Sequence, residues 1–173
     1  MRPRQTAAVE PIVDTQLMDA TWRAVGAMPE AEIRRKQGLC GKEQEELTGF
    51  VLAFTSELPS EALGLALYVH FVVIEAFRHS GARFRKLKPR RIEDTWKGNF
   101  GFVNDLRAAG HSRAPFQLEA ALAPEPAVMQ YVIDALTEES DDGPVNLTDD
   151  DYWRIVQVLK TVADCMHFAR RSE

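Results

Sequence analysis

One stretch constrains this chain more than any other. Residues 60–79, SEALGLALYVHFVVIEAFRH, contain the longest apolar run, and Glu75 is the only charged residue between positions 62 and 77. A helix that is apolar on nearly all sides lies in the core of a bundle or crosses a membrane. The run is shorter than the roughly 20 apolar residues of a membrane span, and it contains His70 as well as Glu75. We therefore predict a buried central helix over Ser60–His79 and no membrane association.

The rest of the chain predicts further helices around this one. No segment alternates apolar and polar residues between hairpin turns, so we assign no sheet. A chain of 173 residues is long enough for one domain with a real core. We predict an all-α, single-domain bundle of about six helices over residues 14–171 and a disordered N-terminal tail over residues 1–13. Helical patterns cover residues 14–28, 30–37, 42–58, 93–110, 126–139 and 149–171.

Local signals mark individual helices. Asp14 suits the N-cap of the first helix, whose inward residues are predicted to include Trp22 and Val25. Gly98 and Gly101 fall inside the helix that begins near residue 93, where each costs up to ~1 kcal/mol relative to alanine. We expect these two glycines to mark the close approach of another backbone or a local break.

Composition narrows the class of protein. The formal net charge of -5 argues against general coating of nucleic acids. Cys40 and Cys165 are too few for a disulfide framework and lack CxxC spacing, so we expect two free thiols. Residues 1–15 carry no apolar run of a secretory signal. We expect a cytoplasmic protein.

No common enzyme motif is present. The chain lacks GxGxxG, GxxxxGK[ST], GxSxG and HExxH, and the acidic stretch 141–151 does not match an EF-hand loop. We therefore assign no catalytic residue and expect no cofactor.

Two carboxylate–histidine pairs raise a metal-dependent enzyme as an alternative. Glu75 and His79 are four residues apart, and Asp164 and His167 three apart, so each pair shares a helix face. Bundles that hold two metal ions use Glu-x-x-His pairs together with further inward glutamates. We predict that Asp164 and His167 face water, opposite the apolar stripe of their helix. Glu75 and His79 remain the candidate metal ligands, or else a simple i,i+4 pair.

His70 is a candidate catalytic base. On the helical projection it falls among Leu63, Leu67, Ile74 and Phe77, which predicts a buried imidazole. A buried imidazole needs a hydrogen-bond partner, whereas a catalytic base needs a cleft and a second reacting group. We favour a core histidine with a satisfied hydrogen bond.

The charged residues are distributed most unevenly at the basic segment 78–91, RHSGARFRKLKPRR. It holds seven of the 21 lysines and arginines and no acid, whereas the remainder has 14 basic and 26 acidic residues. Such a segment suits contacts with the phosphates of nucleic acid or another polyanion, with Phe84 available for stacking. It could instead be solvated, or pair with acids at 138–142 and 149–151. The candidate binding residues are Arg83, Arg85, Lys86, Lys88, Arg90 and Arg91.

Three hypotheses of function follow. The first is a non-enzymatic helical module that binds protein partners, including a second copy of itself, because segments 47–58 and 60–79 carry more apolar surface than one bundle needs. The second is a nucleic-acid or polyanion binder that uses the basic segment. The third is a metal-dependent enzyme around Glu75 and His79.

Overall fold

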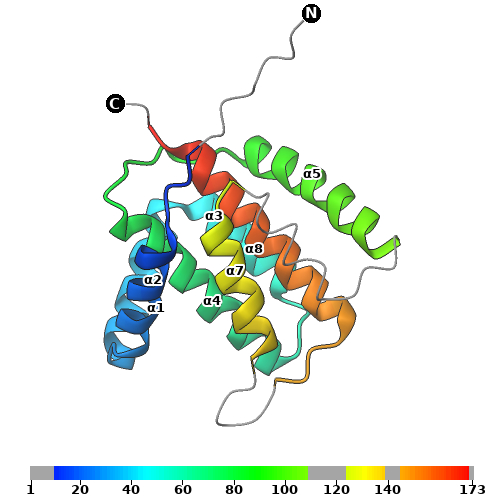
Figure 1. The fold of residues 1–173 in the computed structure, drawn as a ribbon, viewed down its shortest axis with the longest axis horizontal. Helices are drawn as coiled ribbons and strands as arrows, with labels where there is room; N and C mark the ends of the chain where they lie inside the picture. Colours follow the sequence, from blue (N-terminus) through cyan, green and yellow to red (C-terminus); the bar gives the residue numbers. More distant parts are fainter. Residues whose placement is uncertain (1–9, 109–123, 139–144, 172–173) are drawn as a thin grey trace, which may run out of the picture.

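The computed structural model describes residues 10–108, 124–138 and 145–171. Within these ranges it has helices and no strand (Figure 1), so the predicted all-α fold is confirmed. The seven helices of the described chain are α1 (Thr15–Gly26), α2 (Glu30–Glu43), α3 (Glu45–Thr55), α4 (Ser60–His79), α5 (Pro89–Ala108), α7 (Pro126–Thr137) and α8 (Asp149–Ala169).

The centre of the bundle is formed by α4 and α8. α4 has the predicted bounds, Ser60–His79, and it packs against α1, α3, α7 and α8. α8 is buried more completely, with sixteen of its 21 residues buried against eleven of the 20 in α4. The reason is that α3, α4, α5 and α7 all contact α8, and α5 lies along one side of it (Figure 1). The predicted packing around a central helix is therefore present, and α8 shares that position.

α4 would also fit a membrane span by length and composition. The mean hydropathy of its most apolar 18 residues is 1.5, and 61% of that window is buried in the structure. The buried core helix of a soluble protein can have the same length and hydropathy. The packing of α4 against four other helices accounts for its apolar sequence, so the hydropathy is weak evidence for a membrane.

In α1 the predicted N-cap residue is confirmed, but the predicted inward face is partly wrong. Asp14 Oδ1 accepts a hydrogen bond of 2.8 Å from Leu17 N, as expected of an N-cap. Val25 is buried as predicted, but Trp22 is 42% exposed and Thr21 is buried instead. Successive helical residues point about 100° apart, so a one-residue difference in the inward face exchanges these two side chains.

The N-terminal tail predicted over residues 1–13 is too long, because residues 12 and 13 are attached to the bundle. Val13 is fully buried, and the N–H groups of Ile12 and Val13 donate to the two carboxylate oxygens of Glu125 at 2.8 and 3.0 Å. His167 Nδ1 lies 2.6 Å from the same carboxylate. Residues 12 and 13 are thus bound to the folded domain, while residues 1–9 lie outside the described residues. The prediction missed this because the contact joins residues more than 110 positions apart.

The expectation for Gly98 and Gly101 is wrong. α5 runs without a break from Pro89 to Ala108, and nothing lies within 4 Å of a Cβ built on either glycine. Both residues are exposed on the outer side of α5. α5 therefore forms in spite of these glycines, because its other side packs on α3 and α8.

Candidate functional sites

The prediction that Asp164 and His167 face water is wrong. Both side chains are buried, because α5 packs along this side of α8 and Glu125, just before α7, contacts His167. The Asp164 carboxylate pairs with Lys160 Nζ at 3.1 Å and accepts a hydrogen bond of 3.1 Å from Asn99 Nδ2. His167 is bound to Glu125 instead. The two residues belong to separate networks and form no joint metal site.

Glu75 and His79 lie in an ion-pair cluster at the end of α4. The Glu75 carboxylate is buried, with Oε2 2.9 Å from Lys36 Nζ and Oε1 3.0 Å from Arg78 Nη1. His79 Nε2 is 3.8 Å from the same carboxylate, and its Nδ1 is 3.2 Å from Thr21 Oγ1. No group of three or more His, Cys, Asp or Glu side chains that could hold a metal occurs in the described ranges. Two cations already neutralise Glu75, so the geometry favours the ion-pair interpretation.

Both cysteines are free, as predicted, and the structure shows that both are buried. Burial raises the pKa of Cys40, although Arg78 Nη1 lies 3.6 Å from its Sγ and opposes the shift. Burial raises the pKa of Cys165 to about 11. Because the thiolate is the reactive form, neither thiol is activated for nucleophilic or redox chemistry.

His70 is buried, as predicted, but the hydrogen-bonding capacity of its ring is not fully satisfied. Its Nδ1 has no hydrogen-bond partner among the described residues. The side chain borders a cavity of about 200 Å³ that Cys40, Leu67 and Ile74 also line. Burial lowers the pKa of His70 to about 4, because the charged imidazolium is poorly solvated there. A proton on His70 therefore opposes folding.

This lowered pKa predicts an acid-sensitive contribution to stability. As the pH falls from 6.5 towards 4, the unfolded chain binds a proton at His70 and the folded chain does not, so stability is lost over that window. At pH 4 the loss amounts to about 3 kcal/mol. In urea unfolding at pH 7 and pH 4, His70→Leu should lose less stability on acidification than the native chain by that amount. Equal pH dependence in the two proteins would contradict the assignment.

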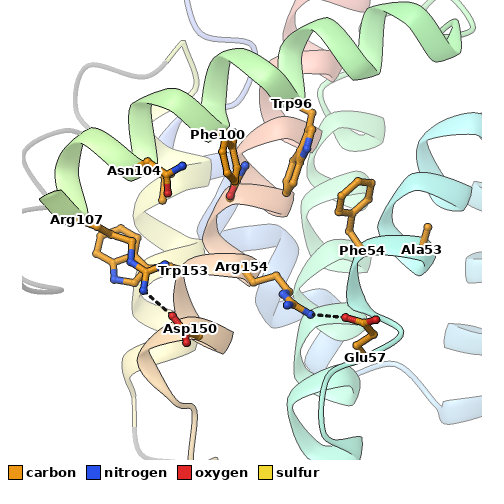
Figure 2. A pocket seen from close by; sticks show the side chains of 12 residues that line it. Ala53, Phe54, Glu57, Trp96, Phe100, Asn104, Arg107, Asp150, Trp153 and Arg154 are labelled. Carbon is orange, nitrogen blue, oxygen red and sulfur yellow. Dashed lines mark hydrogen bonds and ion pairs between the residues drawn. The ribbon is translucent and has the colours of Figure 1, made fainter.

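An aromatic groove of about 520 Å³ lies between α3, α5 and α8 (Figure 2). Trp96 and Phe100 project into it from α5, and Phe54 faces them from α3. The ring centroids of Phe54 and Trp96 are 4.4 Å apart. The sequence patterns did not reveal this groove, since its walls come from three separate segments. Its lining is Ala53, Phe54, Glu57, Trp96, Phe100, Val103, Asn104, Arg107, Asp150, Trp153, Arg154 and Gln157.

The basic segment is held along the end of α8. Phe84 and Arg170 form an antiparallel bridge, flanked by two backbone hydrogen bonds of 2.8 Å, from Arg85 N to Ala169 O and from Arg171 N to Arg83 O. This pairing fixes the backbone of the segment and places Arg170 and Arg171 beside it. No local sequence pattern predicts this pairing, because it joins residues more than 80 positions apart.

Gln44, between α2 and α3, fixes the next part of the segment. Its Nε2 donates to Arg85 O at 3.1 Å, and its Oε1 accepts from Leu87 N at 3.1 Å. Leu87 is buried, and the half-buried ring of Phe84 meets Phe77 edge-on at 5.8 Å. The apolar side chains of the segment thus point inward, which leaves its cations outside. All six predicted cations are exposed, and with the two arginines after α8 they form what we call the basic surface: Arg83, Arg85, Lys86, Lys88, Arg90, Arg91, Arg170 and Arg171.

The cations of the basic surface form no ion pair with acids of the described chain. Glu45 and Glu46 share a small pocket with Lys86 and Lys88, yet no ion pair joins them. Glu138, Asp150 and Asp151 are described, and none of them forms an ion pair with this surface; Asp150 pairs with Arg107 instead. Residues 139–142 lie outside the described residues. Arg78 is not part of this surface, since it pairs with Glu75.

Comparison with known proteins leaves the side chains as the only guide to function. No protein-family model, curated protein or solved structure matches this chain. Among the features above, the basic surface has the most specific chemistry, because it combines exposed cations with a fixed backbone.

Proposed function

We propose that this protein binds single-stranded nucleic acid through the basic surface. The observation that carries the proposal is the set of eight exposed cations without acidic partners in the described chain, on a segment held by the end of α8. The hypothesis that ranked second from the sequence therefore becomes the first. Its rival, in which acids of the same chain pair with the segment, loses support at Glu138, Asp150 and Asp151.

The charge distribution supports contact with phosphates. Each lysine or arginine that neutralises a phosphate releases a condensed counterion, which drives binding at moderate salt. Arginine adds bidentate hydrogen bonds to phosphate oxygens. The backbone hydrogen bonds at Arg83 and Arg85 hold this part of the segment in the absence of a ligand, so little backbone entropy is lost on binding. The remaining surface is acidic overall and would orient an approaching polyanion towards this side.

An exposed aromatic ring favours a single strand. Phe168, in the last turn of α8, is 52% exposed, and the guanidinium of Arg91 lies 5.3 Å from its ring centroid. Aromatic rings among cations stack with unpaired bases, which duplexes do not offer. An acidic protein would use the cations but would gain less from the ring. We therefore expect a preference for single strands over duplexes.

The test compares two triple variants with the same change in charge. Alanine at three positions of the basic surface should weaken binding of a short single-stranded oligonucleotide by about tenfold or more at ~0.1 M salt. Alanine at three exposed arginines of α1 and α2 should change it by less than about twofold, because these residues are not part of the basic surface. Fluorescence anisotropy measures both. The first variant replaces Arg83, Lys86 and Lys88, and the control replaces Arg23, Arg34 and Arg35.

Two outcomes would count against the proposal. Equal losses in the two variants would show that only net charge matters. Absence of binding by the native protein, even at low salt, would return first place to the protein-interaction module and its predicted self-association. Competition with a blunt duplex and with an acidic polypeptide decides whether single strands are the preferred polyanion.

A further inference from the structure

The aromatic groove has open ring surface and a size suited to a small ligand. Phe54 and Phe100 are 40% and 51% exposed, and Trp96 lies between them, with its centroid 4.4 and 6.4 Å from theirs (Figure 2). The volume of about 520 Å³ falls within the range of small-molecule sites. A flat ring can therefore stack on the exposed faces.

Two carboxamides give the groove a polar side. Asn104 is exposed on α5 and projects towards α8 (Figure 2), and Gln157 of α8 lines the groove as well. Gln157 is 6% exposed, and its Nε2 has no hydrogen-bond partner within the described part of the chain. Because the last torsion of glutamine is broad, a small rotation can present either amide atom to a ligand. A carboxamide offers a donor and an acceptor side by side, which matches the edge of a heterocycle.

The charges along the groove are already compensated. Arg107 lies 2.5 Å from Asp150, and Arg154 lies 3.4 Å from Glu57 (Figure 2). Each arginine thus has an acidic partner, so an anionic ligand gains little here. In this respect the groove differs from the basic surface, whose cations form no ion pair with acids of the described chain.

From these three observations we infer that the aromatic groove is a second binding site, which takes an uncharged heterocycle of the nucleobase type. The rings stack on its faces, and the carboxamides of Asn104 and Gln157 pair with its edge. An aliphatic or phenyl side chain would fill the same space but would leave the amides unpaired. The site stands independently of the basic surface, because it needs no phosphate.

Equilibrium dialysis of the native protein against the four ribonucleosides tests this site. At least one nucleoside should bind with a Kd below about 1 mM. Phe100→Ala should weaken that binding by about fivefold to a hundredfold, the usual effect of losing a stacking ring. Trp22→Ala is the matched control, since Trp22 is also an exposed aromatic residue, at 42%, but lies on α1 outside the groove and the basic surface, and it should leave nucleoside binding unchanged. Because Phe100 is half exposed, its variant should stay folded, which circular dichroism verifies.

The remaining outcomes are distinct. Absence of nucleoside binding at ~1 mM, or equal losses in Phe100→Ala and Trp22→Ala, would overturn the inference. Binding of indole in preference to every nucleoside would also overturn it and would identify a docking groove for protein side chains. The triple variant of the basic surface should keep nucleoside binding, so failure of the proposed function and failure of this site can be told apart. If Phe100→Ala also weakens oligonucleotide binding, the groove binds a base of the nucleic-acid strand. If it does not, the groove binds a free nucleobase or nucleoside.

Discussion

Replacing Asp164 by leucine is expected to lower the free energy of unfolding by about 3–5 kcal/mol. Asp164 is the counterion of Lys160, whose side chain is only 11% exposed between α5 and α8. The leucine would leave a buried ammonium without a partner, and Asn99 Nδ2 would lose one of its two acceptors. Urea unfolding followed by circular dichroism measures the loss.

The matched control removes both charges. Lys160→Met combined with Asp164→Leu should return the stability to the native value within about 1 kcal/mol or exceed it, because no buried charge is left unpaired. If Asp164→Leu alone costs less than about 1 kcal/mol, the ammonium has another route to solvent, and the buried network described for α5 and α8 is wrong.

Glu125→Ala is the second change with a large expected effect. The buried carboxylate accepts hydrogen bonds from Ile12 N and Val13 N and lies 2.6 Å from His167 Nδ1. Each unsatisfied buried donor costs about 1–3 kcal/mol, so the loss of stability should reach about 3–6 kcal/mol. Hydrogen exchange should also quicken selectively at the amides of residues 12 and 13.

Glu138→Ala provides the control for Glu125→Ala. Glu138 is exposed at the opposite end of α7, so its replacement should change stability by no more than about 0.5 kcal/mol. If Glu125→Ala left both the stability and the exchange at residues 12 and 13 unchanged, the attachment of the N-terminal segment to the bundle would be refuted.

The parts of the fold that the sequence predicted are those set by local chemistry. The apolar residues of α4 and the Asp14 cap follow from side chains close together in the chain. The wrong predictions concern residues whose burial depends on a segment far away in the sequence. On its own, α8 has an apolar stripe and a polar side, and the polar side is buried only because α5 covers it with Asn99 as a hydrogen-bonding partner for Asp164.

The candidate sites follow the same division. The six cations of the basic segment were visible in the sequence, because they are consecutive or nearly so. Their extension by Arg170 and Arg171 depends on a bridge to Phe84 that no local pattern encodes. The orphan Nδ1 of His70 was equally hidden, since helical periodicity predicts burial but not the presence of a partner. Sequence reasoning thus supplied residue types, and tertiary contacts decided their environment.

The most direct test of the central claim is the salt dependence of oligonucleotide binding by the native protein. Each phosphate contact with a single strand contributes about −0.7 to the slope of log K against log salt. With half or more of the eight cations of the basic surface engaged, the slope should lie between about −3 and −6, and the triple variant of that surface should lower its magnitude by about 2. A slope near zero, or no binding at low salt, would contradict the assignment of this surface to nucleic acid.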